Sequence, residues 1–320
     1  MRQQSFQADD FEKYRKPTRK EIFLKDMEQI IPWKELCQVI KPYYPKPKGA
    51  GRRPIGIERM LRIHFLKHWF ALSDPAAEEA LYDSRAMRAF IGIDLGQEPV
   101  PDETTICKFR HLMERNNLGD ALFHKVNDYL AENGMKVARG TIVDATIINA
   151  PSSTKNKDKA RDPDMHQTRM GNQWYFGMKA HIGVDSKNKL IHSVCATAAN
   201  VHDSQVLEDL LHGDETRLWG DSVYSGQKET LREHAPNAKD FTNKKGCRNR
   251  LLTDEDKSKN STKSSVRAKV EHIFRIMKCQ FGFTKLRFRG LDKNATHLFT
   301  TCALINLVLS KKRLLRLAQA

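Results

Sequence analysis

Cysteine is scarce in this chain of 320 residues, and its spacing excludes two common kinds of site. There are six cysteines, and no two of them form a Cys-x-x-Cys pair: Cys37, Cys107, Cys195, Cys247, Cys279 and Cys302. This spacing fits neither a zinc site nor a disulfide framework. We therefore expect free thiols in a reducing cytosol.

Long hydrophobic runs are also missing. The most apolar stretch is 298–309, LFTTCALINLVL, which is too short to span a bilayer and contains Thr and Asn. The N-terminal sequence MRQQSFQADDFEKYRK has no apolar run after its basic residues, so it does not resemble a signal peptide. We expect a buried helix at 298–309, no membrane partner and a cytoplasmic protein.

Negative charge is in short supply. The chain has 39 Asp and Glu against 55 Lys and Arg, which gives a formal net charge of +16. Such an excess favours a polyanionic partner, either nucleic acid or an anionic membrane surface. The basic residues are scattered or lie in loops rather than along one amphipathic helix, which disfavours the membrane surface. The length suggests two domains, or one large domain with appendages.

The first 135 residues have the pattern of a compact helical domain. Apolar residues at helical spacing predict a helix over 58–72, and Asp74-Pro75 starts a second helix that reaches residue 90. Asp102 caps a third helix, and a fourth ends near Asn133-Gly134. Four basic residues precede the first of these helices without an acidic neighbour, either as a DNA-contacting arm or as a solvated linker: Lys46, Lys48, Arg52 and Arg53.

From Gly140 the pattern changes to strands. We expect strands at 141–148, 175–184, 190–198, 216–224 and 240–242, and helices at 203–211, from 227 and at 265–280. Polar loops are expected at 151–174 and 244–263. Adjacent antiparallel strands followed by alternating strands and helices predict a mixed α/β sheet flanked by helices, and a ribonuclease-H-like sheet is one fold with that order. The catalytic domain would then cover residues 136–320.

Three acidic residues stand out by position. Asp144 and Asp221 each lie within an apolar strand pattern, and Glu271 lies on the helix predicted at 265–280. Taken singly, each has an ordinary explanation as a turn, edge or surface residue. However, a charge buried in an apolar strand is costly unless it is paired or bound to metal. Two carboxylates on neighbouring strands would repel each other, and hard oxygen ligands suit magnesium or manganese.

The helix that carries Glu271 has two distinct faces. Val266, Val270, Ile273 and Met277 form an apolar stripe at spacings typical of a helix packed on a sheet. Arg267, Glu271 and Lys278 share the neighbouring face. The ordinary alternative is an exposed ion pair between Arg267 and Glu271, worth a few tenths of a kcal/mol.

These residues carry a resemblance to a known family. The pattern R-x-x-x-E-x-x-x-x-x-x-K of Arg267, Glu271 and Lys278 resembles the C-terminal signature of DDE transposases of bacterial insertion sequences. The stretches GTIVDATIINAP, TAANVHDSQVLEDLL, WGDSVYSG and VRAKVEHIFRIMKCQFGFTKLRFRGLDKN resemble insertion-sequence family five, which is related to family four, and PDETTICKFRHLMER resembles the helical N-terminal domain of that group. The resemblance runs from about residue 52 to 309. One departure is Ser264, where the family-four signature has Tyr.

The resemblance implies a function and a set of site residues. Asp144, Asp221 and Glu271 would be the catalytic residues and would hold two Mg²⁺ or Mn²⁺ ions for phosphodiester chemistry. Arg267 and Lys278 would hold DNA phosphates. The protein would bind the terminal inverted repeats, cleave DNA and transfer the 3′ ends to target DNA, as a homodimer on DNA and in association with the nucleoid. The Asn-x-x-Asp feature of the family matches a neighbouring set that would support the site or cap a helix: Asn200, His202 and Asp203.

Two other functions remain open at this point. A ribonuclease-H-like nuclease or resolvase would share the acidic triad but would not need sequence-specific binding of the repeats. A catalytically inactive DNA-binding regulator would bind DNA without metal-dependent cleavage. The helical residues 1–135 would bind the ends of the element, and the catalytic residues 136–320 would cut them.

Overall fold

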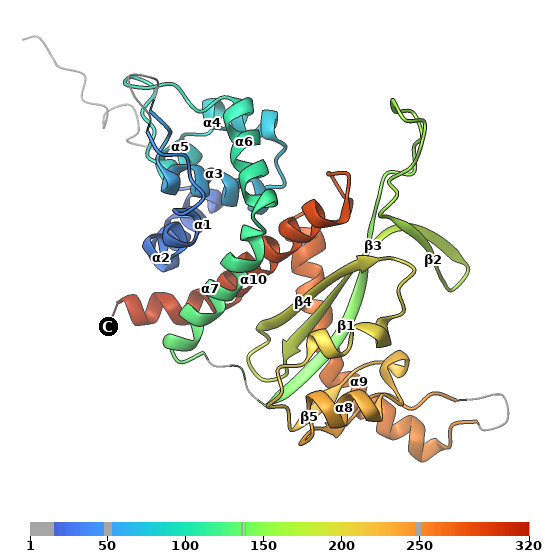
Figure 1. Cartoon of the computed structure of the whole chain (residues 1–320). Coiled ribbons are helices and arrows are strands. Elements are labelled where there is room, and N and C mark those ends of the chain that lie inside the picture. The colour runs from blue at the N-terminus through green and yellow to red at the C-terminus, as the bar shows by residue number, and fades with distance from the viewer. Residues whose placement is uncertain (1–15, 48–52, 136, 138, 247–250, 320) are drawn as a thin grey trace, which may run out of the picture.

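The computed structural model describes residues 16–47, 53–135, 137, 139–246 and 251–319. Up to residue 135, the regular secondary structure of the described residues is entirely helical, as predicted (Figure 1). The helices are α1 (Arg19–Ile30), α2 (Trp33–Ile40), α3 (Ile57–Trp69), α4 (Asp74–Asp83), α5 (Arg85–Ile91), α6 (Glu103–Arg115) and α7 (Leu118–Glu132). Asp102 caps α6, because its side chain accepts a hydrogen bond from the backbone N–H of Thr105.

The single helix predicted up to residue 90 is two helices. Ser84 separates α4 from α5 with an extended backbone conformation, φ −99° and ψ 105°. Its hydroxyl accepts a hydrogen bond from the N–H of Met87 and so caps α5. A serine side chain competes for backbone hydrogen bonds in this way, which explains why the helix breaks although the apolar pattern continues.

The second half of the chain is built around a mixed six-stranded sheet. Its strands are β1 (Gly140–Asn149), β2 (His166–Met170), β3 (Gln173–Asp185), β4 (Ile191–Ala198), β5 (Arg217–Trp219) and β6 (Lys239–Asp240). β3 pairs antiparallel with both β1 and β4. On the other side of β1, β5 pairs with it in parallel, and β6 pairs in parallel with β5. This order is the mixed α/β arrangement predicted from the sequence and is consistent with a ribonuclease-H-like sheet.

Four sequence predictions in this half differ from the structure. The loop predicted at 151–174 contains the edge strand β2, whose mostly polar residues have no apolar alternation to reveal it. The helix predicted at 203–211 is two short 3-10 turns, η2 (Asp203–Val206) and η3 (Glu208–Leu210). β5 ends at Trp219 rather than at residue 224. The loop predicted at 244–263 ends early, since helix α9 (Asp254–Arg275) begins ten residues inside it.

Helices cover both faces of the sheet and connect it to the N-terminal part. α9 packs on β1 and β5 and continues into a π-helical turn, η5 (Ile276–Gln280). On the opposite face, α8 (Lys228–His234) and η3 enclose a smaller apolar cluster that includes Val143, Leu218 and Tyr224. The last helix, α10 (Leu291–Ala318), packs on α7, α1 and β4 (Figure 1). It contains the apolar stretch 298–309, which is largely buried, as predicted.

Candidate active site

Asp144 lies in the middle of β1. Its neighbours Ile142 and Val143 are fully buried, and its own side chain is only 14% exposed. Because side chains alternate along a strand, Val143 enters the smaller apolar cluster while Asp144 faces α9. The carboxylate accepts a hydrogen bond from the N–H of Ala145 at 2.9 Å. The strand therefore holds this carboxyl group on the face of the sheet that α9 covers.

Asp221 reaches the same place from the neighbouring strand. β1 and β5 are parallel, with Ile142 opposite Trp219. Two residues further along the same register, Asp221 lies level with Asp144, although it already stands beyond the end of β5. Its carboxylate caps the 3-10 turn η4 (Ser222–Tyr224) by accepting a hydrogen bond from the N–H of Val223 at 2.9 Å. The end of a parallel strand thus presents the second carboxylate.

Helix α9 supplies the third carboxylate and a cation. Val270 and Ile273 are fully buried against the sheet, which turns Arg267 and Glu271 toward its edge. The Arg267 guanidinium lies 3.9 Å from Asp144 Oδ2, 4.0 Å from Asp221 Oδ2 and 3.8 Å from Glu271 Oε1. Three carboxylates that are far apart in the sequence therefore surround one guanidinium. The pairing of Arg267 with Glu271 is not an isolated surface ion pair.

Contacts on both sides fix the position of α9. Lys269 Nζ donates a hydrogen bond to the carbonyl of Ser186, in the turn between β3 and β4. Ser264 accepts one from Asn243 Nδ2 at 3.0 Å, and Lys263 Nζ donates one to the carbonyl of Thr242. Ser264, which replaces the Tyr of the family-four signature, thus ties the helix to the segment after β6.

The carboxylate cluster perturbs the protonation of Asp144. Burial raises the pKa of Asp144 from 3.8 to about 7, and the Arg267 charge and the Ala145 hydrogen bond only partly oppose this effect. The neighbouring carboxylates of Asp221 and Glu271 raise this pKa further. The three carboxylates can carry more negative charge than one guanidinium neutralises. A cation bound at this position would favour the ionised form of Asp144.

Lys278 is the remaining member of the helix signature. It lies on η5 and is half-buried. Burial lowers the pKa of Lys278, and the charge of Glu271 opposes this shift. The basic residues predicted to contact DNA before the first helix do not belong to the elements that carry the three carboxylates. Lys46 and Arg53 stand in the segment between α2 and α3, and Lys48 and Arg52 fall outside the described residues.

Asp203 belongs to a second polar network beside the carboxylates. Its Oδ1 accepts a hydrogen bond from Lys179 Nζ at 2.8 Å and lies 4.0 Å from His181 Nδ1. Lys179 also donates to the carbonyl of Val201 at 2.7 Å. His202 accepts a hydrogen bond from the N–H of Ser204 and so caps η2, whereas Asn200 is exposed. Lys179 and His181 were not predicted from the sequence.

Tyr224 was also not predicted from the sequence. It is 1% exposed, and its hydroxyl has no hydrogen-bond partner in the part of the chain that the structure describes. Burial raises its pKa, and the carboxylates of Asp203, Asp144 and Asp221 raise it further. The only sequence signal for Tyr224 was its place three residues after Asp221.

The donor chemistry of the cluster suits a divalent cation. Three carboxylates offer hard oxygen ligands of the kind that Mg²⁺ and Mn²⁺ prefer. In the described residues, no three His, Cys, Asp or Glu side chains are gathered closely enough to hold a metal ion. Glu271 is 61% exposed on its helix, and its long side chain is free to turn toward the two aspartates. The three carboxylates are thus ligands of the type that such an ion prefers, and the Arg267 guanidinium lies between them.

Comparison with known proteins identifies the class. A family model described as "Transposase DDE domain" matches residues 136–307, which is more than half of the chain. A second, described as "Transposase domain (DUF772)", matches residues 11–112. No solved structure matches. The chain therefore belongs to the DDE transposases, enzymes of metal-dependent DNA cleavage and strand transfer, and its partner is DNA. Among the helices described, none has the length and apolar character needed to cross a membrane.

Proposed function

We propose that this transposase belongs to insertion-sequence family five, and that Asp144, Asp221 and Glu271 are its catalytic residues. The observation that supports this most strongly is geometric. A single guanidinium, that of Arg267, lies within 4.0 Å of all three carboxylates. The residues come from β1, from the end of β5 and from α9, on a sheet consistent with a ribonuclease-H-like domain.

The three carboxylates would hold two Mg²⁺ or Mn²⁺ ions. When bound, such ions activate the attacking oxygen and stabilise the leaving oxygen in displacement at phosphorus. Asp144 supplies a rigid, mostly buried oxygen pair from the sheet, and Asp221 supplies a second pair held by its cap on η4. Glu271 is the mobile member, because its side chain is the most exposed of the three.

Arg267 and Lys278 would bind DNA phosphates next to the carboxylates. The three Arg267 contacts are 3.8 Å or longer, so the guanidinium makes no hydrogen bond to these carboxylates and keeps its N–H donors for a phosphate. Lys278 follows Glu271 by seven residues, about two helical turns, and lies in the π-helical turn η5. Both steps of transposition are in-line displacements, so one set of phosphate contacts serves cleavage and strand transfer.

The remaining parts of the proposal concern the whole protein. Residues 1–135 would form a helical domain that binds the terminal inverted repeats, with Lys46, Lys48, Arg52 and Arg53 following phosphates. Residues 136–320 would cleave the DNA and transfer its 3′ ends to the target. Joining two ends requires two active sites, most simply in a homodimer on DNA. The protein would act on DNA in the cytoplasm, in association with the nucleoid.

Sequencing the DNA on both sides of the reading frame, followed by a cleavage assay, tests the proposal. Paired inverted repeats should bracket the gene. The full-length protein should cut duplexes that carry these repeats in Mg²⁺ or Mn²⁺, but not in EDTA, and should leave scrambled duplexes uncut. Equal cutting of scrambled duplexes would indicate a nuclease or resolvase, whereas binding without metal-dependent cutting would indicate a regulator.

A further inference from the structure

The β2–β3 hairpin forms an arm beyond the main sheet. β1 pairs with β3 only as far as Asn149 opposite Gly177, and β4 pairs with β3 only from Met178 onward. The first four residues of β3, 173–176, therefore pair with β2, and beyond the Ala150 N–H bond to the Phe176 carbonyl they have no partner strand on the β1 side among the described residues. They extend about 13 Å past the end of β1 at the usual rise per residue. Figure 1 shows this two-stranded arm projecting from the sheet.

The tip of the arm carries the most exposed tryptophan of the chain. Trp174 is 63% exposed, whereas the other three tryptophans are 9% exposed or less: Trp33, Trp69 and Trp219. Arg169 is its cross-strand partner and shares its face of the hairpin. Met170, at the turn, is 59% exposed. An indole of this exposure contributes nothing to the core, and burying it against a ligand would be favourable.

The acidic residues of the loop that precedes the arm contact the segment at the start of α10. Asp158 pairs with Arg289 at 3.0 Å, Asp162 accepts a hydrogen bond from the N–H of Gly290, and Asp164 accepts one from the N–H of Leu291. All three aspartates thus tie the loop to the start of α10.

The positive charges of the same loop are left outside. Lys155, Lys157 and Lys159 are exposed, and none has a carboxylate within ion-pair distance in the residues that the structure describes. Among the described residues, Arg169 donates hydrogen bonds to the Gly171 carbonyl and the Asn172 side chain alone. The outer surface of this loop and of the tip of the arm, residues 155–174, therefore combines cations with one exposed indole ring.

We propose that this arm binds DNA in which a base is unpaired, with Trp174 stacked on that base and the loop lysines on the flanking phosphates. Base stacking on an aromatic side chain needs an accessible π-face, which an unpaired base offers and a paired base inside a duplex does not. Lysines supply the sequence-independent attraction to phosphates. The inference rests on the proposed function, because cleavage and joining of strands create DNA ends and unpaired bases.

A second copy of this chain fits the arm less well. Its exposed apolar area is confined to Trp174 and Met170, which is much less than a stable protein interface buries. The cations around them would repel the equally basic surface of another copy. Charge complementarity therefore favours a nucleic acid.

Fluorescence titration of the full-length protein tests the proposal, since Trp174 is the tryptophan most exposed to solvent. The probes are a single-stranded oligonucleotide, a duplex with three unpaired bases at one end, and the matching blunt duplex. Wild-type fluorescence should be quenched strongly by the first two probes, and this quenching should disappear in Trp174→Phe. Trp174→Ala should weaken their binding on the order of tenfold while leaving the blunt duplex within a factor of about two. Leu317→Ala removes an exposed apolar residue near the end of α10, outside residues 1–135, and serves as the control.

Unchanged affinities in Trp174→Ala, or no quenching of wild-type fluorescence, would overturn the proposal. A change of oligomeric state in Trp174→Ala without a change in DNA affinity would assign the arm to a second copy instead, and would also overturn it. Failure of the proposed function would look different, because the wild-type protein would then cut scrambled duplexes as well as repeat duplexes, or would not cut the repeat duplex in Mg²⁺, whatever the affinities of Trp174→Ala.

Discussion

At the scale of single residues, the environment of Asp144 disfavours its ionised carboxylate. Its side chain is largely buried in a strand, and burial raises its pKa to about 7. Only Arg267, at 3.9 Å, brings positive charge within ion-pair distance of it among the described residues. Functional sites commonly sacrifice stability in this way, since the geometry suited to a ligand is costly in its absence.

The raised pKa of Asp144 predicts the effect of Asp144→Asn on stability. Between about pH 4 and pH 7, the folded protein keeps a proton on Asp144, whereas the unfolded chain, with the ordinary pKa of 3.8, has released it. The stabilisation from this proton is present below about pH 4 and is lost as the pH rises through about 7. Asp144→Asn should therefore raise Tm by several degrees at pH 8 in EDTA and leave it nearly unchanged at pH 4. Calorimetry at both pH values measures this, with Asp120→Asn on α7 as the control. A lower Tm at pH 8 would show that the carboxylate stabilises the fold.

Tyr224 allows a second prediction at this scale. Its buried hydroxyl has no partner in the described residues, and an unsatisfied buried polar group costs about 1–3 kcal/mol. Tyr224→Phe should therefore keep or raise the free energy of unfolding, as measured by urea denaturation. Tyr224→Ala, which empties a fully buried site, should lower it by roughly 3–5 kcal/mol. A clear loss of stability in Tyr224→Phe would mean that the hydroxyl has a partner.

At the scale of secondary-structure elements, the site depends on how short segments end. Asp221 reaches the carboxylate cluster because β5 stops at Trp219 and the chain turns into η4. The turn η2, which begins at Asp203, packs on η4, and Lys179 on β3 anchors it by an ion pair. Lys179 is thus placed to position the segment that carries Asp221.

Substitution of Lys179 tests this chain of contacts. Lys179→Met should reduce cleavage by about tenfold or more, because Asp203 loses the cation that holds η2 against η4. Lys179→Arg should restore much of the activity, since it keeps a cation on the same strand. The metal concentration required for half-maximal cleavage should rise in Lys179→Met, which a general loss of folded protein would not cause. An unchanged metal requirement together with unchanged cleavage would argue against the positioning role.

The elements also show what the sequence could predict. The apolar strand around Asp144 and the two-faced pattern around Glu271 were readable, because both are long and regular. The start of α9 was readable in principle, since Thr253 caps the helix and Asp254, Glu255 and Asp256 occupy its first turn. The polar composition of 254–263 favoured a loop instead.

Other features were not available from local sequence. β2 is an edge strand that is mostly exposed, so no burial pattern marks its residues. The contact of Arg267 with two aspartates depends on the β1–β5 register and on the docking of α9, both of which are long-range. The same holds for Lys179, whose partner Asp203 lies 24 residues away.

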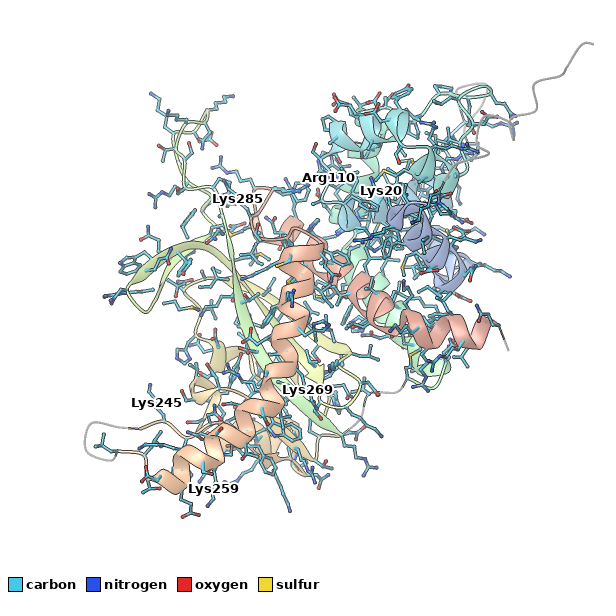
Figure 2. All side chains as sticks on the ribbon, turned by 180° about the vertical axis from the view of Figure 1, so that it is seen from behind. Lys20, Arg110, Lys245, Lys259, Lys269 and Lys285 are labelled. Atoms are coloured by element: carbon cyan, nitrogen blue, oxygen red, sulfur yellow. The ribbon has the colours of Figure 1, made fainter. Side chains whose placement is uncertain are left out.

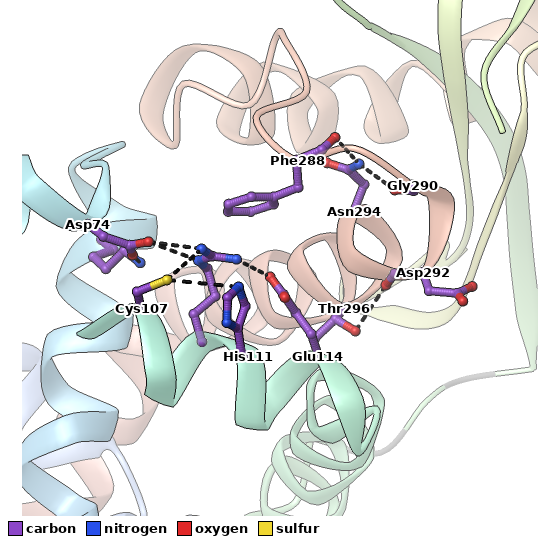
Figure 3. Close-up of polar contacts among 11 residues, drawn as sticks. Asp74, Cys107, His111, Glu114, Phe288, Gly290, Asp292, Asn294 and Thr296 are labelled. Atoms are coloured by element: carbon purple, nitrogen blue, oxygen red, sulfur yellow. Dashed lines mark hydrogen bonds and ion pairs between the residues drawn. The ribbon is translucent and has the colours of Figure 1, made fainter. Parts of the chain in front are cut away.

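At the scale of the whole molecule, α10 joins the N-terminal helices to the catalytic sheet. Arg110 on α6 is central to this junction, between residues that Figure 3 labels: Asp74, Glu114 and Phe288. Its guanidinium pairs with Asp74 and Glu114 and lies 4.4 Å from the centre of the Phe288 ring, in the segment before α10. In Figure 2, Arg110 and Lys285 lie near this junction, while Lys269 and Lys259 continue along α9. Basic side chains thus extend across both halves of the molecule.

Buried histidines make this junction sensitive to acid. His297 on α10 stacks on His68 of α3 at 4.1 Å between ring centres, beside a cavity of about 190 Å³. Burial lowers the pKa of His297 from 6.5 to about 3, and the charges of Arg287, Lys67 and Arg110 lower it further. The pKa values of His64 and His68 are lowered by burial as well.

These shifts predict how stability depends on pH. An unfolded chain binds protons on its histidines below about pH 6.5, whereas the folded junction holds them neutral to much lower pH. The free energy of unfolding should therefore fall as the pH drops from 6.5 toward 4. His297→Phe, which keeps an aromatic ring without the titration, should show a smaller fall, measured by urea denaturation at each pH. His124→Phe, an exposed histidine on α7, is the control. Equal slopes in wild type and His297→Phe would contradict this account.

The most direct test of the central claim is a cleavage and strand-transfer assay of Asp144→Asn, Asp221→Asn and Glu271→Gln on DNA that carries the repeats, with Mg²⁺. Glu255→Gln serves as the matched control, because Glu255 is an exposed carboxylate near the start of the same helix α9. The account predicts that each of the three variants loses cleavage by a factor of about 1,000 or more and still binds the repeat duplex, whereas Glu255→Gln cleaves like the wild type. Wild-type cleavage in any of the three variants would contradict it.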